Sequence, residues 1–219
     1  MKAVLFDAMG TLVRLEPPAP RLRAELAERF GIELSEEEAR VAIGAEIAYY
    51  RAHHDDGRDA ASLADLRARC AAALAAALPG TPPPLPELTE ALLASLRFAP
   101  YPDAIAALDR LRAAGVARVV VSNWDASLHE VLDRVGLGPL LDGVVTSAEA
   151  GAAKPDPEIF RQGLALARAA PGEALHVGDT VAHDVEGARA AGIAAVLLVR
   201  DGEAPPGAIR TLDDLPSNL

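Results

Sequence analysis

Cysteine, aromatic residues and long apolar runs are all scarce in this sequence of 219 residues. Its single cysteine, Cys70, excludes a disulfide within the chain, and its leucine and alanine neighbours favour a small buried side chain over a catalytic thiol. The N-terminal apolar run, Ala3 to Phe6, is too short for a signal-peptide core or a membrane span. A cytoplasmic protein with no membrane partner is therefore expected.

Basic residues are also in deficit. Subtracting 32 Asp and Glu from 21 Lys and Arg leaves a net charge of −11, which repels nucleic acid and anionic lipid surfaces. A small-molecule partner is expected instead, and a phosphorylated one requires a bound cation and a local lysine to reverse the potential. The composition is otherwise that of a folded protein, with 51% hydrophobic and 24% charged residues. It leaves monomer and homodimer equally open.

Strand and helix patterns alternate over most of the chain. Lys2 to Phe6 is typical of a buried strand, and further strands are expected at 118–121, near 144–145, at 175–177 and at 195–199. Helices are expected between them, near 104–114, up to Gly136, from Pro157, and up to Gly192. Strands that alternate with helices predict an α/β fold with a parallel sheet.

Residues 16–98 differ from the rest, because their apolar residues recur at helical spacing without strand-like alternation. Leu22, Leu26 and Phe30 show the spacing, and Ser35 with Glu38 forms a capping-box pattern. We predict a helical bundle of roughly four helices. The proline-containing segment 98–102 then predicts a stiff connector back to the α/β part. The expected domains are 1–15 with 99–219, and 16–98.

Four motifs follow one another in order, each where a strand should end or a helix begin. They are Phe6-Asp7-Ala8-Met9-Gly10-Thr11-Leu12, Val121-Ser122-Asn123, Lys154-Pro155-Asp156, and His176-Val177-Gly178-Asp179 with Asp184. A single Asp, Ser or Asn at such a place is usually a helix cap. The ordered set, however, resembles the motifs of the haloacid dehalogenase-like superfamily over nearly the whole chain. The resemblance implies a Rossmann-like, doubly wound parallel-sheet core with an inserted helical cap.

The resemblance also implies roles for residues at the strand ends. Asp7 would be the catalytic nucleophile, since a carboxylate can form a covalent intermediate that water later splits. Ser122, together with the backbone of Asn123, would hold the oxygens of the transferring group, and Lys154 would supply positive charge. Other substrate contacts are expected from Gly10, Thr11 and Trp124. For Trp124, packing is at least as good an explanation as a wall of the substrate site.

A magnesium site is expected beside the nucleophile. By the resemblance the metal ligands are Asp7, Asp179, Asp184 and the backbone carbonyl of Met9. Carboxylate and carbonyl oxygens are the ligands that Mg²⁺ prefers. The alternative for Asp179 or Asp184 is an ordinary cap of the following helix.

Met9 departs from the family's phosphatases, which have a second aspartate there as general acid and base. The loss of a general acid and base typically lowers the rate by about 10²–10⁴-fold, so the replacement of this aspartate by Met9 should slow phosphatase chemistry without abolishing it. His53, His54 and Asp125 are candidates for the missing role. For the histidines, solvated loop positions are the simpler explanation.

Three functions remain, and we rank a magnesium-dependent phosphatase of a small phosphorylated metabolite first. A 2-haloacid dehalogenase ranks second: it needs no proton on the departing halide, but an acidic pair without a metal would repel a haloacid. A protein that keeps the fold and metal site for binding alone ranks third.

Overall fold

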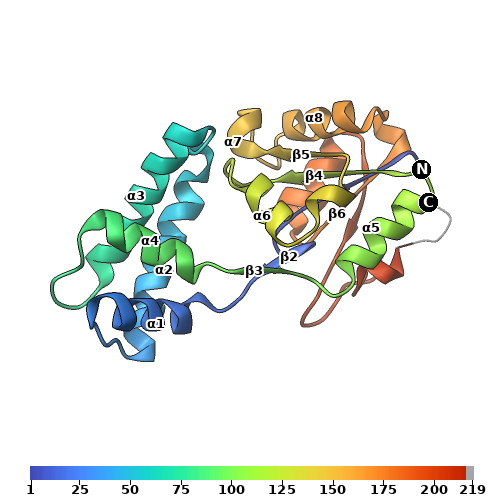
Figure 1. Cartoon of the computed structure of the whole chain (residues 1–219). Coiled ribbons are helices and arrows are strands. Elements are labelled where there is room, and N and C mark those ends of the chain that lie inside the picture. The colour runs from blue at the N-terminus through green and yellow to red at the C-terminus, as the bar shows by residue number, and fades with distance from the viewer. Residues whose placement is uncertain (216–219) are drawn as a thin grey trace. The chain divides into compact units, whose positions relative to one another are not determined.

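The computed structural model describes residues 1–215, and the chain divides into two compact units (Figure 1). One unit combines Met1–Arg14 with the chain from Ala99 onward, and the other is Leu15–Phe98. These bounds lie within one residue of the expected domains. The roles of catalytic core and cap stay predictions.

A five-stranded parallel sheet forms the centre of the first unit, in the order β5-β4-β1-β6-β7. The strands are β1 (Ala3–Phe6), β4 (Ala117–Ser122), β5 (Gly143–Thr146), β6 (Ala174–Gly178) and β7 (Ala194–Leu197). After β1 the chain forms β4 and β5 on one side of β1, and it then crosses over to form β6 and β7 on the other side, so the sheet is doubly wound. The predicted α/β class is confirmed.

Helices cover both faces of this sheet, with α8 above it and α5 below it in Figure 1. Leu5, Val119 and Val121 of the sheet belong to one buried cluster with Phe160 and Leu164 of α8. Burial on both faces explains why the central strands are almost continuously apolar. The regular helices of this unit are α5 (Ala104–Ala113), α6 (Leu128–Arg134), α7 (Ser147–Ala150), α8 (Pro157–Ala167) and α9 (Gly187–Ala190).

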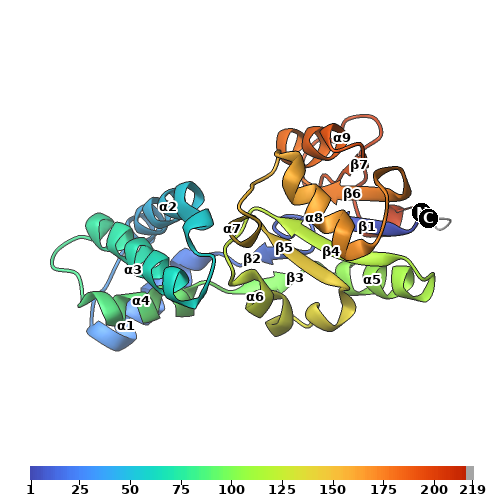
Figure 2. The same cartoon turned by 90° about the horizontal axis from the view of Figure 1, so that it is seen from above.

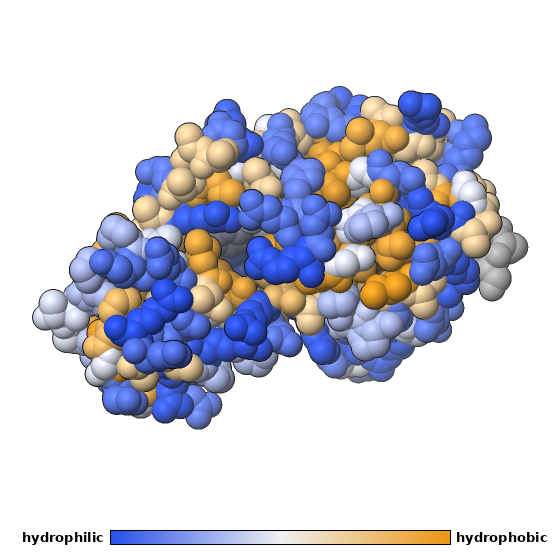
Figure 3. Space-filling view, in the orientation of Figure 1, coloured by the Kyte–Doolittle hydropathy of each residue, from blue (hydrophilic) through white to orange (hydrophobic). Residues whose placement is uncertain are grey.

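The second unit is helical and has a core of its own (Figure 2). Its helices are α1 (Pro18–Phe30), α2 (Glu36–His53), α3 (Ala60–Ala77) and α4 (Leu85–Ser95), with a 3₁₀ turn η1 (His54–Asp56). The capping box predicted from Ser35 and Glu38 begins α2. Leu22 and Leu26, two of the residues whose spacing predicted a helix, are fully buried. Hydrophilic side chains cover much of this unit's visible surface, at the left of Figure 3.

Two features near the site differ from the sequence-based expectation. Phe98–Pro100, expected only as a stiff connector, forms β3 and pairs with β2 (Val13–Leu15) in a separate two-stranded sheet. Strands this short carry too little alternation to be seen in a sequence. The helix expected up to Gly192 begins as a π-helical segment, η4 (Val181–Glu186), before α9.

The remaining short segments are the 3₁₀ turns η2 (Gly138–Leu140), η3 (Pro171–Glu173) and η5 (Leu212–Asp214). Strand β7 ends at Leu197, two residues before the expected end, although Leu198 still bridges Ile209. Among the helices of residues 1–215, none is long and apolar enough to cross a membrane.

Candidate active site

The candidate site lies at the carboxyl edge of the three central strands. Phe6 of β1 is in register with Val120 of β4 and Val177 of β6. Asp7 therefore comes one residue beyond that level, and Ser122 and Asp179 come two residues beyond it. In a doubly wound sheet this is where connections leave in opposite directions and ligands bind. The topology thus brings three separate motifs together.

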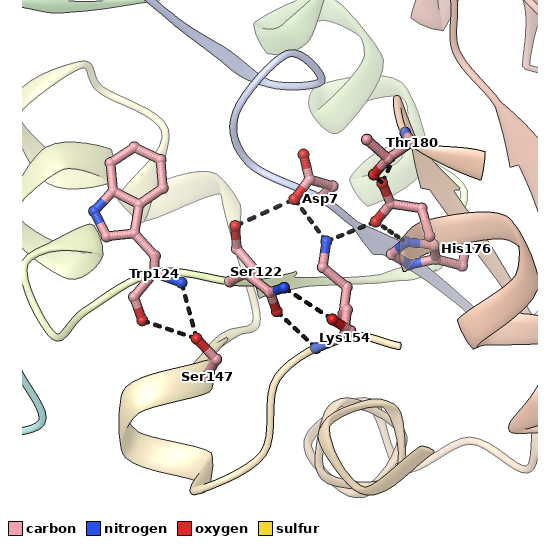
Figure 4. Close-up of polar contacts among 9 residues, drawn as sticks. Asp7, Ser122, Trp124, Ser147, Lys154, His176 and Thr180 are labelled. Atoms are coloured by element: carbon pink, nitrogen blue, oxygen red, sulfur yellow. Dashed lines mark hydrogen bonds and ion pairs between the residues drawn. The ribbon is translucent and has the colours of Figure 1, made fainter. Parts of the chain in front are cut away.

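Asp7 and Lys154 form the buried centre of this arrangement (Figure 4). Lys154 Nζ donates to Asp7 Oδ1 at 2.7 Å, and Ser122 Oγ donates to the same oxygen at 3.2 Å. The other carboxylate oxygen of Asp7 points away from both donors in Figure 4. Three residues predicted to act together are therefore in direct contact, with one Asp7 oxygen directed elsewhere.

Asp184 holds Lys154 from the other side. Its Oδ1 accepts from Lys154 Nζ at 2.6 Å and from His176 Nε2 at 3.0 Å. Its Oδ2 accepts from the Thr180 backbone N–H at 3.0 Å and from the Thr180 hydroxyl. A carboxylate has about four lone-pair positions, so these donors fill Asp184. Direct metal coordination by Asp184 stays a prediction. It would require a metal ion to displace one of these hydrogen-bond donors from the Asp184 carboxylate.

Charge and burial act against each other in this cluster. Burial works to lower the pKa of Lys154, but Asp7 and Asp184 outweigh it and raise that pKa, so the ammonium stays charged. Burial raises the pKa of Asp7, and Asp184 adds to this effect while Lys154 opposes it. Burial also works to raise the pKa of Asp184, but His176 and Lys154 lower it overall. The buried lysine thus favours the ionised form of both carboxylates.

Asp179 is the third carboxylate of the group, and it is exposed, unlike Asp7 and Asp184. Each of the three offers an oxygen, and these oxygens lie within 4.8 Å of one another. Although the residue as a whole is exposed, its carboxyl group packs against Gly10, and the partial burial of that group, followed by the charges of Asp7 and Asp184, raises its pKa to about 6. Crowded carboxylates of this kind gain from a cation between them.

Gly10 allows the loop after Asp7 to pack against Asp179. Its φ is +81°, and a Cβ added there would lie 2.1 Å from Asp179 Oδ2. Gly178 has a similar relation to Asp184, whose Cγ would be 2.2 Å from an added Cβ. Both glycines are therefore required by close approach to an acidic side chain.

The Asn123 side chain holds the backbone of Lys154. Its Oδ1 accepts from the Lys154 N–H at 2.7 Å, and its Nδ2 donates to the Lys154 carbonyl at 3.0 Å. This pair joins the end of β4 to the loop before α8, where the Lys154–Pro155 peptide bond is cis. Asn123 thus supports Lys154 through its side chain, and only its backbone is left for the predicted contact to substrate.

The other residues singled out from the sequence lie as follows. Trp124 is buried, and its indole ring lies apart from the Asp7 group in Figure 4, a position that favours packing over contact with substrate. Thr11 is also buried, and Met9 is partly exposed beside Val13. Asp125 is buried and caps a local turn by accepting from the Ser127 N–H at 2.8 Å.

The histidines proposed as substitute acids belong to the helical unit. His53 stacks on Tyr49 with 4.0 Å between ring centroids, and its Nδ1 lies 2.8 Å from the Tyr49 carbonyl oxygen. His54 contacts the ring of Tyr50 and the carboxylate of Asp55. Each has local partners that explain its position without a catalytic role.

Two residues of the site were not singled out from the sequence. His176 was quoted as part of a motif without a role, and Thr180 was not considered. His176 is fully buried, which lowers its pKa and leaves a neutral ring that donates from Nε2 to Asp184. A histidine inside an apolar strand was the available signal, since buried polar groups need partners.

A surface cavity of about 390 Å³ beside α6 and β5 includes none of the candidate site residues.

Residues 1–192 match the family model of haloacid dehalogenase-like hydrolases. The chain is 32% identical to glyceraldehyde 3-phosphate phosphatase of Methanopyrus kandleri, over 99% of the chain and 91% of that protein. It is 43% identical over 93 residues to haloacid dehalogenase-like hydrolase domain-containing protein 3 of Bos taurus. That match covers 42% of the chain and only 37% of that relative's length.

Two solved structures are similar over nearly the whole chain, and each similarity covers 98% of the chain and 96% of the other protein. A phosphatase from Thermococcus onnurineus is 31% identical, with a TM-score of 0.67. L-2-haloacid dehalogenase from Xanthobacter autotrophicus is 25% identical, with a TM-score of 0.69. Because both chemistries occur among structures this similar, the site residues must discriminate between them.

Proposed function

This chain belongs to the haloacid dehalogenase-like hydrolases, and we propose that it is a magnesium-dependent phosphatase of a small phosphorylated metabolite. The observation that carries the proposal is the contact of Asp7 with both Lys154 and Ser122, next to the carboxylate of Asp179. A nucleophile held by a buried cation and flanked by excess acidic charge fits an anionic substrate bound together with a metal ion.

The donor set fits magnesium. Three carboxylates lie close together and only one lysine contacts them, through Asp7 and Asp184, so the group has an excess of negative charge and offers oxygen atoms as metal ligands. We assign the metal ligands to Asp7, Asp179 and the Met9 carbonyl, and we assign Asp184 to holding Lys154. When bound, magnesium would offset the negative charge of a phosphate group.

Hydrolysis would proceed in two steps. The Asp7 carboxylate attacks phosphorus, and the bond from phosphorus to the leaving oxygen breaks with its electron pair on that oxygen. Water then attacks the aspartyl-phosphate, which releases inorganic phosphate and restores Asp7. Lys154 and Ser122 stay beside Asp7 throughout and stabilise the charge that develops on the phosphoryl oxygens.

Met9 determines which leaving groups are suitable, because methionine can neither protonate the departing oxygen nor activate water. The leaving groups of aryl and acyl phosphates depart without being protonated. We therefore expect these phosphates to be hydrolysed faster than alkyl or sugar phosphates. The variant Met9→Asp should narrow this gap, with a gain of about 10²–10⁴ for alkyl phosphates. If Met9→Asp folds, binds magnesium and improves no phosphate ester, phosphoryl transfer is the wrong chemistry.

Dehalogenation is the second candidate, favoured by Met9 and by the likeness to L-2-haloacid dehalogenase. There Asp7 would attack carbon and halide would depart unprotonated. The acidic pair of Asp179 and Asp184 weighs against it, because without a metal it would repel the carboxylate of a haloacid. Binding without catalysis ranks third, since it leaves the contact between Asp7 and Lys154 without a purpose.

One assay separates these functions. Aryl, acyl and alkyl phosphates and 2-haloacids are incubated with the wild type and with Asp7→Asn, each with magnesium and with EDTA. A phosphatase releases phosphate only with magnesium, and Asp7→Asn abolishes release because an amide cannot attack. Halide release that is indifferent to EDTA would establish dehalogenation. Turnover by purified Asp7→Asn would place the nucleophile elsewhere.

A further inference from the structure

Arg200 lies outside every motif singled out in the sequence, yet its guanidinium group contacts the loop that follows Asp7. Its Nη2 donates to the Thr11 carbonyl at 2.5 Å, and its Nη1 donates to Asp103 Oδ2 at 2.7 Å. The Arg200 side chain is 13% exposed and that of Asp103 is 9% exposed. Arg200 thus joins a buried carboxylate to the loop backbone with charge-assisted hydrogen bonds, which are stronger than neutral ones.

Tyr101 contacts the same loop one residue further on. The guanidinium carbon of Arg200 lies 3.8 Å from the centroid of the Tyr101 ring, which is close enough for a cation–π interaction. The backbone N–H of Tyr101 donates to the Leu12 carbonyl at 2.9 Å. Two consecutive carbonyl groups, those of Thr11 and Leu12, are therefore held by two residues that stack on each other.

Asp103 is itself held in place, which makes Arg200 a fixed point. Besides Arg200, Asp103 Oδ2 accepts from the Thr211 hydroxyl at 2.7 Å and from the Leu212 N–H at 2.8 Å. Burial works to raise the pKa of Asp103, but the Arg200 and Thr211 hydrogen bonds outweigh it and lower that pKa. The carboxylate that orients Arg200 therefore stays charged.

The position of this loop decides the position of the candidate ligands. The Ala8 carbonyl accepts from the N–H groups of residues 11, 12 and 13, so residues 8–13 form a tight turn in which each part is tied to the same carbonyl. Gly10 lies within it, packed against Asp179. Met9, whose carbonyl we assign to the metal, is the residue before Gly10. A shift at the Thr11 carbonyl would therefore be transmitted to the site.

We propose that Arg200 is a positioning residue of the magnesium site: it fixes the loop of residues 8–13, and its loss weakens magnesium binding without unfolding the protein. This inference rests on the proposed function in taking the Met9 carbonyl as a metal ligand. Residues that orient metal ligands typically contribute about 10–100-fold in affinity.

Arg110 provides the matched control, because it supports the same C-terminal segment without touching the loop. It donates to the Leu212 carbonyl at 2.9 Å and pairs with Asp213 at 3.2 Å. We would compare Arg200→Ala and Arg110→Ala by titration calorimetry with magnesium. Hydrogen exchange of the peptide spanning residues 8–14 and thermal melting would be measured on the metal-free proteins.

The expected result is magnesium binding about 10–100-fold weaker in Arg200→Ala than in Arg110→Ala, with faster exchange confined to residues 8–14. Should Arg200→Ala fail to fold, Arg200→Lys replaces it, since lysine keeps a positive charge near Asp103 but lacks the planar guanidinium that donates to two acceptors and stacks on Tyr101. Wild-type affinity and exchange in either folded Arg200 variant would overturn the role of Arg200. Absence of magnesium binding in the wild type would instead show that the proposed metal site is wrong.

Discussion

Glu46 is a buried carboxyl in α2, and its substitution by glutamine should stabilise the protein in a pH-dependent way. The residue is only 4% exposed, and burial raises its pKa to about 7 against an opposing hydrogen bond from Cys70. Its ordinary value is 4.5. Since the folded state binds the proton more tightly than the unfolded state, ionisation of Glu46 favours unfolding.

The size of the effect follows from the two pKa values. Stability linked to protonated Glu46 is fully present below pH 4.5, and it is lost progressively as the pH rises to about 7. The loss at pH 8 is about 3 kcal/mol, against about 1 kcal/mol at pH 5. Glu46→Gln removes the titration. Its stability relative to the wild type should therefore improve by about 2 kcal/mol between these pH values.

Thermal melting at pH 5 and pH 8 measures this difference, and each kcal/mol corresponds to about 2–4 °C for a chain of this size. Comparing two pH values cancels any constant cost of fitting the amide, because that cost is the same at both. Glu28→Gln, on the exposed side of α1, makes the same chemical change at a surface position and serves as the control. If the advantage of Glu46→Gln is the same at pH 5 and pH 8, Glu46 does not titrate as argued.

Three further substitutions test the site itself. Lys154→Met should cost about 3–5 kcal/mol in the free energy of unfolding, because two buried carboxylates lose their shared cation, and melting would reveal it. Gly10→Ala should abolish magnesium binding in calorimetry, since the new Cβ would overlap Asp179. Asn123→Ala should lower turnover by about 10²-fold by releasing the backbone of Lys154 while the fold persists, and kcat with circular dichroism would separate the two.

Local pattern was sufficient for the framework of the molecule. Apolar runs at 3–6 and 118–121 gave strands because buried parallel strands are apolar on both faces. The spacing of Leu22 and Leu26 gave a helix for a similar reason, since one helical face must enter a core. The order of motifs at the strand ends then predicted which residues would meet.

Pattern was insufficient where a feature was very short or depended on a distant partner. Strands β2 and β3 are three residues each, and they exist because they pair with each other. The π-helical segment η4 buries Asp184 against Gly178, a contact that the spacing of apolar residues does not encode. Trp124 could equally have packed or faced a ligand until its burial was known.

The sequence by itself determined that Asp7, Ser122 and Asp179 belong at one sheet edge, because strand ends and their polar residues are local properties. Lys154 follows no strand, and only the resemblance of its motif to the family's assigned it to the site. The tertiary structure decided what each side chain does there. Asp184 has its oxygens filled by Lys154, His176 and Thr180, and Asn123 holds the backbone of Lys154. Arg200 contacts Thr11 across 189 positions of chain. Such pairings depend on how distant segments pack, and no local periodicity contains that information.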